Sequence, residues 1–382
     1  MSKIKLTLLF ALLFIFVRTE LPNTCSQAVR IYTNDYHCDF SEEMPKGLGA
    51  NAIVFVVRKS RTNERFILKV GQLKKDEKFY ESMNNICLEK LHGKRYIIQR
   101  HDIKLHDNMF YEILDYGESG NLSDAQENGL LNDQRNDLII FKKIVEGVQI
   151  IHQNNIIHAD LKMENIVLDK LENPMIIDFD MSVMNNTVNT NRGTFEYMDY
   201  VILRNWGNTT TRFTQEIDKW ALGVLLYKMA FNEYPFVNLA RNKKELLDLI
   251  VKGDISFPEN AAIPLVNVIL NLLRYDQNDR TSLNVLRFKI DNILSSKSWK
   301  YTKEKLFYNI HSFKPAINNI SPVIQLENDK ADKDSDKSSS FKPINILIIL
   351  LLGFAISLMI LYCIRKDKAK RQHNYEIEDI IE

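Results

Sequence analysis

The sequence predicts an α+β fold with two lobes, a small strand-rich lobe followed by a large helical lobe, plus one C-terminal transmembrane helix. Two β-branched and aromatic runs, AIVFVVRKS and ERFILKV, are separated by RTN, which is typical of a β-hairpin. Helical patterns dominate from residue 76 to residue 276. Strands followed by helices indicate an α+β domain. A long uncharged stretch near the C-terminus indicates the membrane helix.

The composition narrows the class of protein. The 382 residues include 45% hydrophobic and 26% charged residues, which fits a globular protein with apolar ends added. A formal net charge of +1, without a basic stripe of interleaved aromatics, predicts no nucleic-acid binding. The four cysteines, Cys25, Cys38, Cys87 and Cys363, form no CxxC pair, so we expect no zinc site. In an oxidising compartment Cys38 pairs with Cys87 or with Cys25, and free thiols are the alternative.

The N-terminus is similar to a secretory signal. Lys3 and Lys5 precede the uncharged run Leu6–Val17, which is too short to span a bilayer, since a span takes about 20 residues. We therefore expect a signal peptide or signal-anchor over residues 1–25, with cleavage near 24–26. An uncleaved anchor or a buried amphiphilic segment is the alternative.

Three pieces are expected in the C-terminal part. Residues 344–364 carry no charge over 21 positions, which predicts a transmembrane helix because only hydrogen-bonded backbone is stable in hydrocarbon. Basic residues at the start of 365–382 place this tail in the cytosol by the positive-inside tendency. The polar composition within 296–343 is typical of a flexible stalk. With the N-terminal signal, this predicts a single-pass type I protein whose domain is lumenal or extracellular.

The body of the sequence carries two features of a phosphate-binding lobe. The segment GLGANAIV, residues 47–54, contains glycines that let a turn bring backbone N–H groups close to phosphates, and a plain hairpin turn is the alternative. Lys69 lies in the run FILKV, where strand alternation points it inward. A buried ammonium group needs an anionic partner, because an unpaired charge is unfavourable away from water.

Chemistry-bearing side chains gather in the segment HADLKMEN and the following MIIDFD. Asp160 is a carboxylate able to accept a hydroxyl proton, and Lys162 balances phosphate charge. Asn165 and Asp178 are oxygen ligands from two segments, which suits Mg²⁺ that keeps its substrate phosphates and waters. Each residue alone is typical of a solvated loop, but the ordered set indicates phosphoryl transfer.

These segments together resemble the eukaryotic protein kinase family over about residues 46–294. GLGANAIV is similar to the glycine-rich loop, ILK to the nucleotide-positioning strand, HADLKMEN to the catalytic loop and DFD to the metal-binding motif. DYGESGNL, after Leu114 as gatekeeper, is similar to the hinge, and GTFEYM to the end of the activation segment. Lys162 after DL, with GT before EYM, matches the serine/threonine pattern. The resemblance implies a divergent, membrane-anchored serine/threonine kinase that uses ATP and Mg²⁺.

The resemblance also implies a role for each matching residue. Asp160 would orient and deprotonate the substrate hydroxyl, and Lys162 would stabilise the transferred phosphoryl group. Asn165 and Asp178 would hold Mg²⁺, and Asp218 would brace the catalytic loop. The nucleotide would be held by the glycine-rich loop, the strand lysine and the hinge, through Gly47, Gly49, Ala52, Val54, Lys69, Asp115 and Asn121.

The family pairs its strand lysine with a glutamate on the first helix, and this sequence offers no direct match. Counting from either side places Asn84 at that position. Glu81 lies one turn earlier on the same helix face, and Glu89 lies five residues too late. We expect Glu81 to be the partner of Lys69.

Several departures from the family pattern bear on regulation. Ala52 replaces the third glycine of the loop, and Asp180 replaces the glycine of the metal motif. Ala159 replaces the catalytic-loop arginine, so nothing is left there to pair with an activation-loop phosphate. Val201 stands where the glutamate that pairs with Arg280 belongs. We therefore expect that buried ion pair to be missing and the substrate-binding segment to be looser.

Two functions are compatible with these features. The first is an active kinase that does not wait for activation-loop phosphorylation, because every residue expected to touch ATP, Mg²⁺ or the hydroxyl is present. The second is a non-catalytic, kinase-like membrane receptor or scaffold, supported by the missing APE triplet, the lack of a direct match for the helix glutamate and the lumenal topology. Nothing in the sequence identifies the protein substrate. N-glycosylation sequons occur at Asn121, Asn185, Asn208 and Asn319, which is about the number expected by chance, so they are not evidence of secretion.

Overall fold

The computed structural model describes residues 22, 24–32, 35–39, 47–48, 52–73, 79–188, 192–206, 211–236, 242–296 and 299–312. The chain divides into two compact units, Met1–Gln325 and Leu326–Glu382, and only the first contains described residues. The expected transmembrane helix, the cytosolic tail, most of the signal segment and Gly49 therefore lie outside the described part. Within that part, we find no helix with the length and apolar character needed to cross a bilayer.

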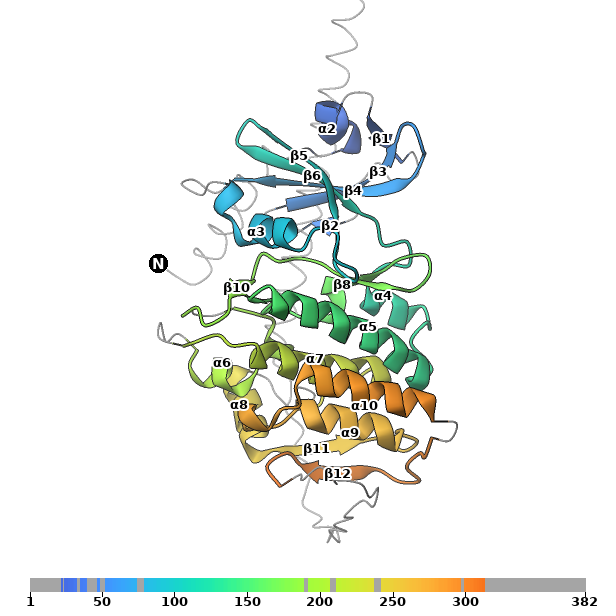
Figure 1. Cartoon of the computed structure of the whole chain (residues 1–382), viewed down its shortest axis with the longest axis vertical. Helices are drawn as coiled ribbons and strands as arrows, with labels where there is room; N and C mark the ends of the chain where they lie inside the picture. The colour runs from blue at the N-terminus through green and yellow to red at the C-terminus, as the bar shows by residue number, and fades with distance from the viewer. Residues whose placement is uncertain are drawn as a thin grey trace, which may run out of the picture. The chain divides into compact units, whose positions relative to one another are not determined.

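An antiparallel sheet of six strands forms the smaller lobe (Figure 1). Its order is β1-β3-β4-β6-β5, and β2 also pairs with β3. The predicted hairpin is present as β3 and β4, which pair from Ala52↔Gly71 to Arg58↔Arg65. The strands are β1 (Tyr36–Cys38), β2 (Gly47–Leu48), β3 (Ala52–Lys59), β4 (Arg65–Gln72), β5 (Arg100–His106) and β6 (Met109–Asp115).

Strand alternation gives this sheet two different faces. On the outer face Phe55, Leu68 and Ile113 are fully buried in one apolar cluster with residues of helix α2 (Cys25–Val29) and turn η1 (Arg30–Tyr32). The opposite face carries polar side chains and is turned toward helix α3 (Met83–Lys90) and turn η2 (Phe79–Glu81). Figure 1 shows α2 above the sheet and α3 below it. The outer face therefore stabilises the lobe, and the inner face is left for function.

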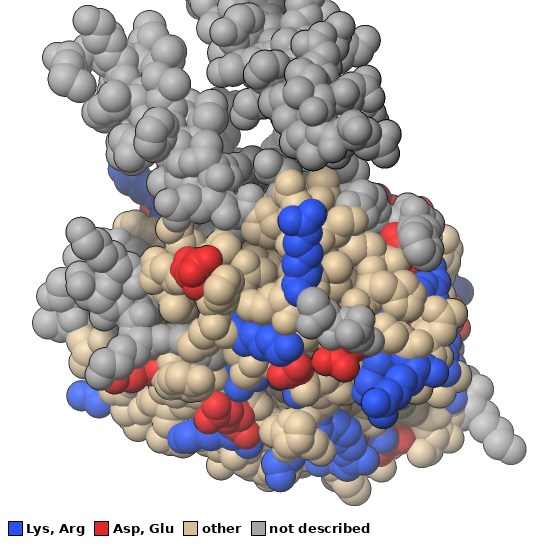
Figure 2. Space-filling view, turned by 90° about the horizontal axis from the view of Figure 1, so that it is seen from above, with Lys and Arg blue, Asp and Glu red and all other residues tan. Residues whose placement is uncertain are grey.

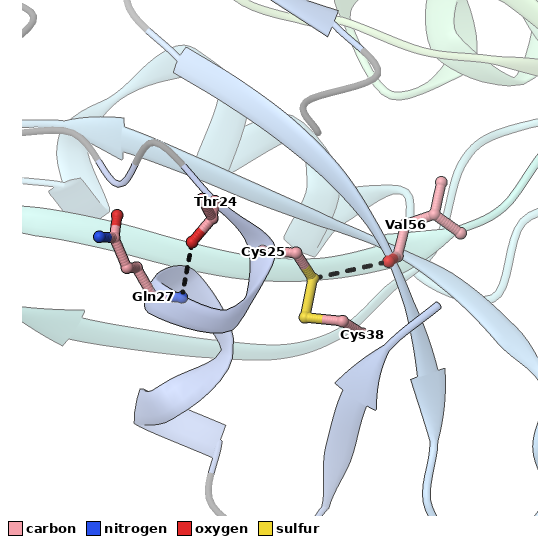
Figure 3. Close-up of a disulfide and its surroundings, with 5 residues drawn as sticks. All are labelled: Thr24, Cys25, Gln27, Cys38 and Val56. Carbon is pink, nitrogen blue, oxygen red and sulfur yellow. Dashed lines mark hydrogen bonds between the residues drawn. A yellow bond between two sulfur atoms is a disulfide. The ribbon is translucent and has the colours of Figure 1, made fainter. Parts of the chain in front are cut away.

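A disulfide between Cys25 and Cys38 joins α2 to the first strand (Figure 3). Of the pairings left open by the sequence this is the second, and Cys87 is a buried free thiol on α3. The Tyr32 hydroxyl adds a hydrogen bond of 2.6 Å to the carbonyl oxygen of Tyr111 on β6. The N-terminal segment is thus part of the smaller lobe, which begins upstream of its predicted start.

Helices and three small two-stranded sheets form the described part of the larger lobe. Helix α7 packs between α5 and α9 (Figure 1) and is buried almost all round, which explains why its sequence is apolar on every face. Trp220, at its centre, is fully buried. The helices are α4 (Leu122–Glu127), α5 (Gln134–Gln153), α6 (Tyr200–Arg204), α7 (Glu216–Phe231), α8 (Lys243–Lys252), α9 (Ile263–Leu272) and α10 (Leu283–Ser295). The paired strands are β7 (Ile156–Ile157) with β10 (Val183–Met184), β8 (Ile166–Leu168) with β9 (Pro174–Ile176), and β11 (Asp254–Phe257) with β12 (Leu306–Asn309).

The larger lobe extends past its predicted boundary at residue 295. Strand β12 pairs with β11 from Asp254↔Asn309 to Phe257↔Leu306, and Ile310 is buried in the core of the lobe. Gly253 takes a φ of +78° at the end of α8, and a Cβ there would lie 2.5 Å from the ring of His311. Residues 299–312, expected in the stalk, therefore complete the domain because alternate side chains of β12 bury against it.

The lobes are joined by backbone contacts behind the hinge. The Ile98 N–H donates to the Ile176 carbonyl at 3.0 Å, and the Ile176 N–H donates to the Tyr96 carbonyl at 2.9 Å. At Gly117 the chain passes so close to β8 that a Cβ would lie 2.7 Å from the Cβ of Val167. The hinge position is therefore determined by backbone packing.

The described surface carries both signs of charge. On the face shown in Figure 2, Lys and Arg side chains are interspersed with Asp and Glu, in keeping with a formal net charge of +1. A mixture of this kind solvates a surface without creating a strong field of one sign.

Candidate active site

Asp160 is the centre of a hydrogen-bonded cluster in the loop that follows β7. The Thr194 hydroxyl donates to Asp160 Oδ1 at 2.6 Å, and Lys162 Nζ lies 2.9 Å from Oδ2. The Asn165 amide donates to Oδ2 at 3.1 Å and to the Asp160 carbonyl at 2.9 Å. Lys162 also donates to the Thr194 hydroxyl at 3.0 Å, which closes the ring of contacts. The carboxylate, whose residue is only 8% exposed, is therefore held in one orientation.

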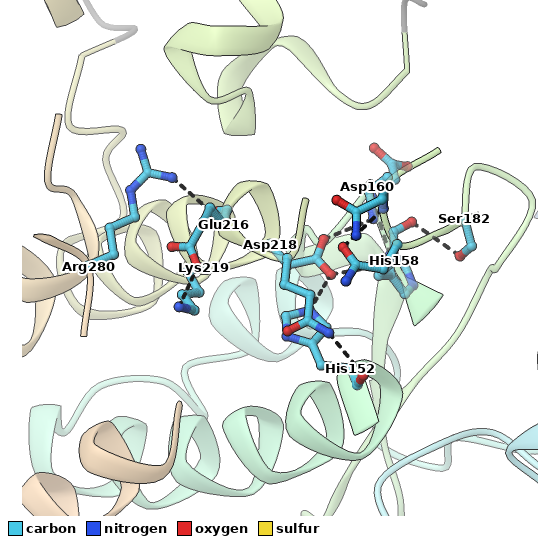
Figure 4. Close-up of polar contacts among 12 residues, drawn as sticks. His152, His158, Asp160, Ser182, Glu216, Asp218, Lys219 and Arg280 are labelled. Atoms are coloured by element: carbon cyan, nitrogen blue, oxygen red, sulfur yellow. Dashed lines mark hydrogen bonds and ion pairs between the residues drawn. The ribbon is translucent and has the colours of Figure 1, made fainter. Parts of the chain in front are cut away.

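Asp218 holds the same loop from beneath (Figure 4). Its carboxylate accepts from the backbone N–H groups of His158 and Ala159, both at 2.9 Å, and lies 2.8 Å from His152 Nε2. Burial alone would raise the pKa of Asp218, but the hydrogen bonds and the neighbouring imidazoles lower it, and the net direction is downward. Asp218 therefore remains ionised and stabilises the left-handed backbone of Ala159, whose φ is +63°.

The two expected metal ligands are placed differently. Asn165 is buried and donates through its amide nitrogen, so its amide oxygen is available to a cation. Asp178 is exposed and adopts a φ of +65°, while the next residue, Phe179, is fully buried against the His158 ring. Among the described residues no group of three or more acidic, His or Cys side chains forms a self-sufficient metal site. This donor set fits Mg²⁺, which binds few protein oxygens and keeps phosphates and waters.

Lys69 does not pair with Glu81 in this structure. Lys69 Nζ lies 3.6 Å from Asp180 Oδ2, whereas Glu81 is an exposed residue of turn η2. The expectation of a Lys69–Glu81 pair failed because η2 ends before α3 begins, so Glu81 does not share a helix face with Asn84. The Asp that replaces the metal-motif glycine has thus become the ion-pair partner of the lysine.

The glycine-rich segment forms the hairpin of β2 and β3. Gly47 pairs with Val54, and Leu48 pairs with Ile53. Val54 is the cross-strand partner of Lys69, so Val54 and the half-buried Ala52 lie on the inner face with the lysine. The described part of this segment therefore lies beside Lys69 in the sheet.

At the hinge, Asp115 uses its carboxylate for local structure. Asp115 Oδ1 lies 2.6 Å from His101 Nε2, and Oδ2 accepts from the Gln99 N–H at 2.9 Å. A nucleotide would meet the backbone of Asp115 and not its side chain. Asn121 caps α4, accepting from the Asp124 N–H at 3.0 Å while Asp124 accepts from the Asn121 N–H. This capping box fixes the place where the hinge enters the larger lobe.

The ion pair expected to be missing is present with a different acid. Asp199 and Arg280 form a salt bridge in which neither side chain is exposed, and Arg280 also donates to the Glu216 carbonyl at 2.7 Å (Figure 4). Asp199 also caps α6 by accepting from the Val201 N–H at 2.8 Å. The sequence did contain this acid, two positions before Val201. Alignment with the family pattern placed Val201 at the position of the glutamate, so Asp199 was not considered as a partner.

The sequence pointed to Thr194 only as part of the GT pattern. In the structure its hydroxyl contacts both Asp160 and Lys162. Beside it opens a small pocket of about 20 Å³ between the catalytic loop and the start of α7. Its lining joins Asp160 and Thr194 to apolar side chains such as Met198 and Ile202.

Comparison with known proteins gives a consistent result. A family model for the protein kinase domain matches residues 40–296. Aurora kinase C of Mus musculus is 25% identical over 252 residues, which covers 64% of this chain and 88% of that protein. An aurora kinase of Patiria pectinifera is 26% identical over 253 residues, covering 64% and 60%. The serine/threonine-protein kinase AtPK1/AtPK6 of Arabidopsis thaliana is 29% identical over 252 residues, covering 63% and 52%.

The matched region contains strands β2 to β6 of the sheet, the catalytic loop and the helices that brace it. Proteins of this family transfer phosphate from ATP to proteins with the help of Mg²⁺. The donor set around Asn165 and Asp178 and the cationic Lys69 fit these two cofactors. With its two lobes and its catalytic cluster, this chain belongs to the protein kinase family.

Proposed function

We propose that this chain is an active kinase that transfers the γ-phosphate of ATP to protein Ser and Thr hydroxyls. The observation that carries the proposal is the ring formed by Asp160, Lys162 and Thr194, in which one hydroxyl touches both catalytic side chains. A serine or threonine side chain is short, so its hydroxyl must come close to the backbone of the catalytic loop to reach a carboxylate. Asp160, which is buried in that loop, is placed for such an approach. The two catalytic side chains are thus already oriented by contacts within the described residues.

Each residue has one task in this reaction. Asp160 accepts the proton of the substrate hydroxyl as the new O–P bond forms and the bond between the γ-phosphorus and the ADP oxygen breaks. Lys162 stabilises negative charge that develops on the transferred group. Lys69 would hold the nucleotide phosphates, and Asn165 and Asp178 would hold Mg²⁺, which would supply positive charge to them.

Activity is proposed to be independent of activation-loop phosphorylation. Ala159 offers no cation to a phosphate group, and the ends of the segment are already held by protein contacts. At one end Thr194 is bonded to Asp160 and Lys162, and at the other Asp199 is paired with Arg280. A phosphate would therefore add little order to the described parts of the segment.

The test is phosphate transfer by purified full-length protein with Mg²⁺ and ATP. Asp160→Asn should lower the rate by about 10²–10⁴-fold, because general-base catalysis is lost while the shape of the side chain remains. Asp254→Asn, the same change at an exposed position of strand β11, is the matched control and should leave the rate unchanged. Equal transfer by wild type and Asp160→Asn would contradict the proposal.

A non-catalytic kinase-like receptor or scaffold is the second candidate. It is favoured by α3, where Asn84 stands in place of an acid and Lys69 has no partner on the helix. This candidate predicts protein binding without phosphate transfer. The same assay separates the two, because only the first requires Asp160.

For location we propose a single-pass type I membrane protein with the kinase domain in the lumen or outside the cell. The support is the buried Cys25–Cys38 disulfide within the smaller lobe, since such bonds persist in oxidising compartments. Because Cys25 is part of the fold, signal cleavage must fall upstream of it. Protease protection of sealed vesicles whose cytosolic face is outward, with and without detergent, tests the topology. Digestion of the kinase domain without detergent would refute a lumenal domain.

Glycosylation gives a second test of location. We expect Asn319 to be modified in a lumenal protein and Asn121 to be unmodified. The Asn121 amide is engaged in the capping box of α4, and a glycan would also crowd the mouth of the nucleotide site. Peptide mass spectrometry after glycosidase treatment in heavy-oxygen water reads both sites, and a glycan on Asn121 in ATP-binding protein would exclude this expectation.

A further inference from the structure

Glu112 is a buried carboxylate beside the nucleotide-positioning lysine. In the antiparallel pairing of β4 with β6, Glu112 is the direct partner of Lys69, so both side chains leave the same face of the sheet. Residues directly opposite each other have Cβ atoms about 5 Å apart. Glu112 is fully buried, whereas the side chain of Asp180, which pairs with Lys69, is 58% exposed. The strand therefore offers Lys69 a second and better shielded anion.

One oxygen of Glu112 has a partner and the other has none. Oε1 accepts a hydrogen bond from Arg100 Nη1 at 3.0 Å. Oε2 is buried and lacks a hydrogen-bond partner among the described residues. Buried carboxylate oxygens are nearly always paired, because an unpaired oxygen loses its hydration without compensation. An acceptor is thus available in the same cross-strand row as the Lys69 ammonium group.

Helix α3, which faces this row, is joined to the sheet by a different residue. Its buried polar side chains are Asn84 and Asn85, and its one acid, Glu89, is exposed. Arg100 donates to Asn85 at 2.8 Å and lies 3.4 Å from Glu89. The helix is therefore attached to the sheet through Arg100, which leaves Lys69 to find its anion elsewhere.

The charges around Lys69 are consistent with that division. Burial by itself would lower the pKa of Lys69, but the carboxylates of Asp180, Glu112 and Asp178 raise it, and the net direction is upward. The ammonium form is therefore favoured although the group is largely shielded from water.

We propose that Glu112 is the positioning residue for Lys69, in the role that an acid on the first helix would otherwise fill. This rests on the proposed function in that Lys69 binds nucleotide phosphates. When phosphates occupy the site, Lys69 is held between them and Glu112 Oε2, and the exposed Asp180 is released. Because Glu112 lies on a strand, the lysine is placed without any movement of α3. Assembly of the nucleotide site then requires only that the Lys69 side chain changes its partner.

A double-mutant cycle on the full-length protein tests this inference. The dissociation constant of a non-hydrolysable ATP analogue with Mg²⁺ is measured for wild type, Glu112→Gln, Lys69→Met and the double variant. Glu112→Gln should weaken binding roughly tenfold in the presence of Lys69 and less than about twofold in its absence, since it acts through the lysine. Equal weakening in both backgrounds would show a merely structural role and overturn the inference.

Glu89→Gln is the matched control. It removes the same charge and also touches Arg100, but it lies on the exposed side of α3, so analogue binding should change less than about twofold. If Glu112→Gln does not fold, the cycle is run in Arg100→Met/Glu112→Met, because a buried ion pair replaced by apolar side chains is usually tolerated. There too, a loss of affinity that persists without Lys69 contradicts the inference.

The pairing is also tested without nucleotide, which separates its failure from failure of the proposed function. Urea unfolding midpoints of the same four proteins should be non-additive, because the opposite charges of Lys69 and Glu112 interact across the strand pair even while Lys69 contacts Asp180. Additive midpoints would refute the pairing even in an active kinase. Non-additive midpoints in a protein that transfers no phosphate would support the pairing and reject the kinase activity.

Discussion

The catalytic loop and the nucleotide lysine are held in contrasting ways. Asp160 lies in a closed set of polar contacts with Thr194, Lys162 and Asn165, on a loop that Asp218 supports from α7. Lys69 has one long contact of 3.6 Å, to an exposed aspartate. The difference shows that Asp160 is oriented by several short contacts, while Lys69 depends on one long contact to an acid that stands where the family pattern has glycine.

The largest expected effect comes from removing the buried Asp199–Arg280 ion pair, which supports the catalytic lobe. Arg280→Met should lower the free energy of unfolding by about 3–5 kcal/mol, because Asp199 would keep a buried charge without its partner. Chemical denaturation followed by circular dichroism measures the change. The double variant Asp199→Leu/Arg280→Met, which removes both charges, should recover much of the loss, and a double variant no better than the single one would contradict this account.

A second test uses a buried carboxyl at the start of α5. Burial, and then the nearby charge of Asp133, raise the pKa of Asp137 to about 7, and Asp137 Oδ1 has no hydrogen-bond partner among the described residues. The folded state therefore keeps a proton that the unfolded state loses near its ordinary value of 3.8. Stability is fully present below that value and is lost as the pH rises to about 7. The loss amounts to at most about 4 kcal/mol.

Asp137→Asn should remove this pH dependence and make the protein more stable than wild type above pH 7. Urea unfolding between pH 4 and pH 8 measures the slope. Asp248→Asn, on the exposed face of α8, serves as the control and should keep the wild-type slope. An unchanged slope in Asp137→Asn would show that this carboxyl is not the group responsible.

The stability of the smaller lobe, which carries Lys69, should depend on the Cys25–Cys38 disulfide. Cys25→Ser/Cys38→Ser opens a loop whose ends are 13 residues apart and should destabilise the protein by about 3 kcal/mol. Thermal unfolding with and without reductant measures this, and reductant should affect wild type only. Cys87→Ser, at the buried free thiol, controls for loss of a cysteine and should not remove the effect of reductant.

The smallest expected effect sharpens the view of the catalytic ring. Thr194→Val keeps the shape of the side chain and removes the hydroxyl that joins Asp160 to Lys162, so kcat should fall about tenfold with little change in KM for ATP. Thr194→Ser keeps the hydroxyl and should retain most of the activity. Equal activity of the Val and Ser variants would show that the hydroxyl does not orient the catalytic side chains.

Local patterns account for the parts of the site that were predicted correctly in place. The β3–β4 hairpin follows from two β-forming runs and a short turn, and Asp160, Lys162 and Asn165 lie within six residues of one another, so one loop suffices to gather them. The expected Lys69–Glu81 pair failed for a related reason. It assumed one continuous helix face, and the turn η2 breaks that face.

By itself, the sequence determined the resemblance to the family, the two-lobed α+β order and the residues proposed for phosphoryl transfer, because each is written in short segments or in their order along the chain. Only the tertiary structure decided which charges meet. Asp199 and Arg280 are 81 residues apart, and strand register places Glu112 opposite Lys69. Such pairs depend on distances of a few ångströms between remote segments. The sequence offers several acids that could pair with each basic residue, and it does not say which of them lies close enough. Folding selects among them by burial, since a charge removed from water must find its partner.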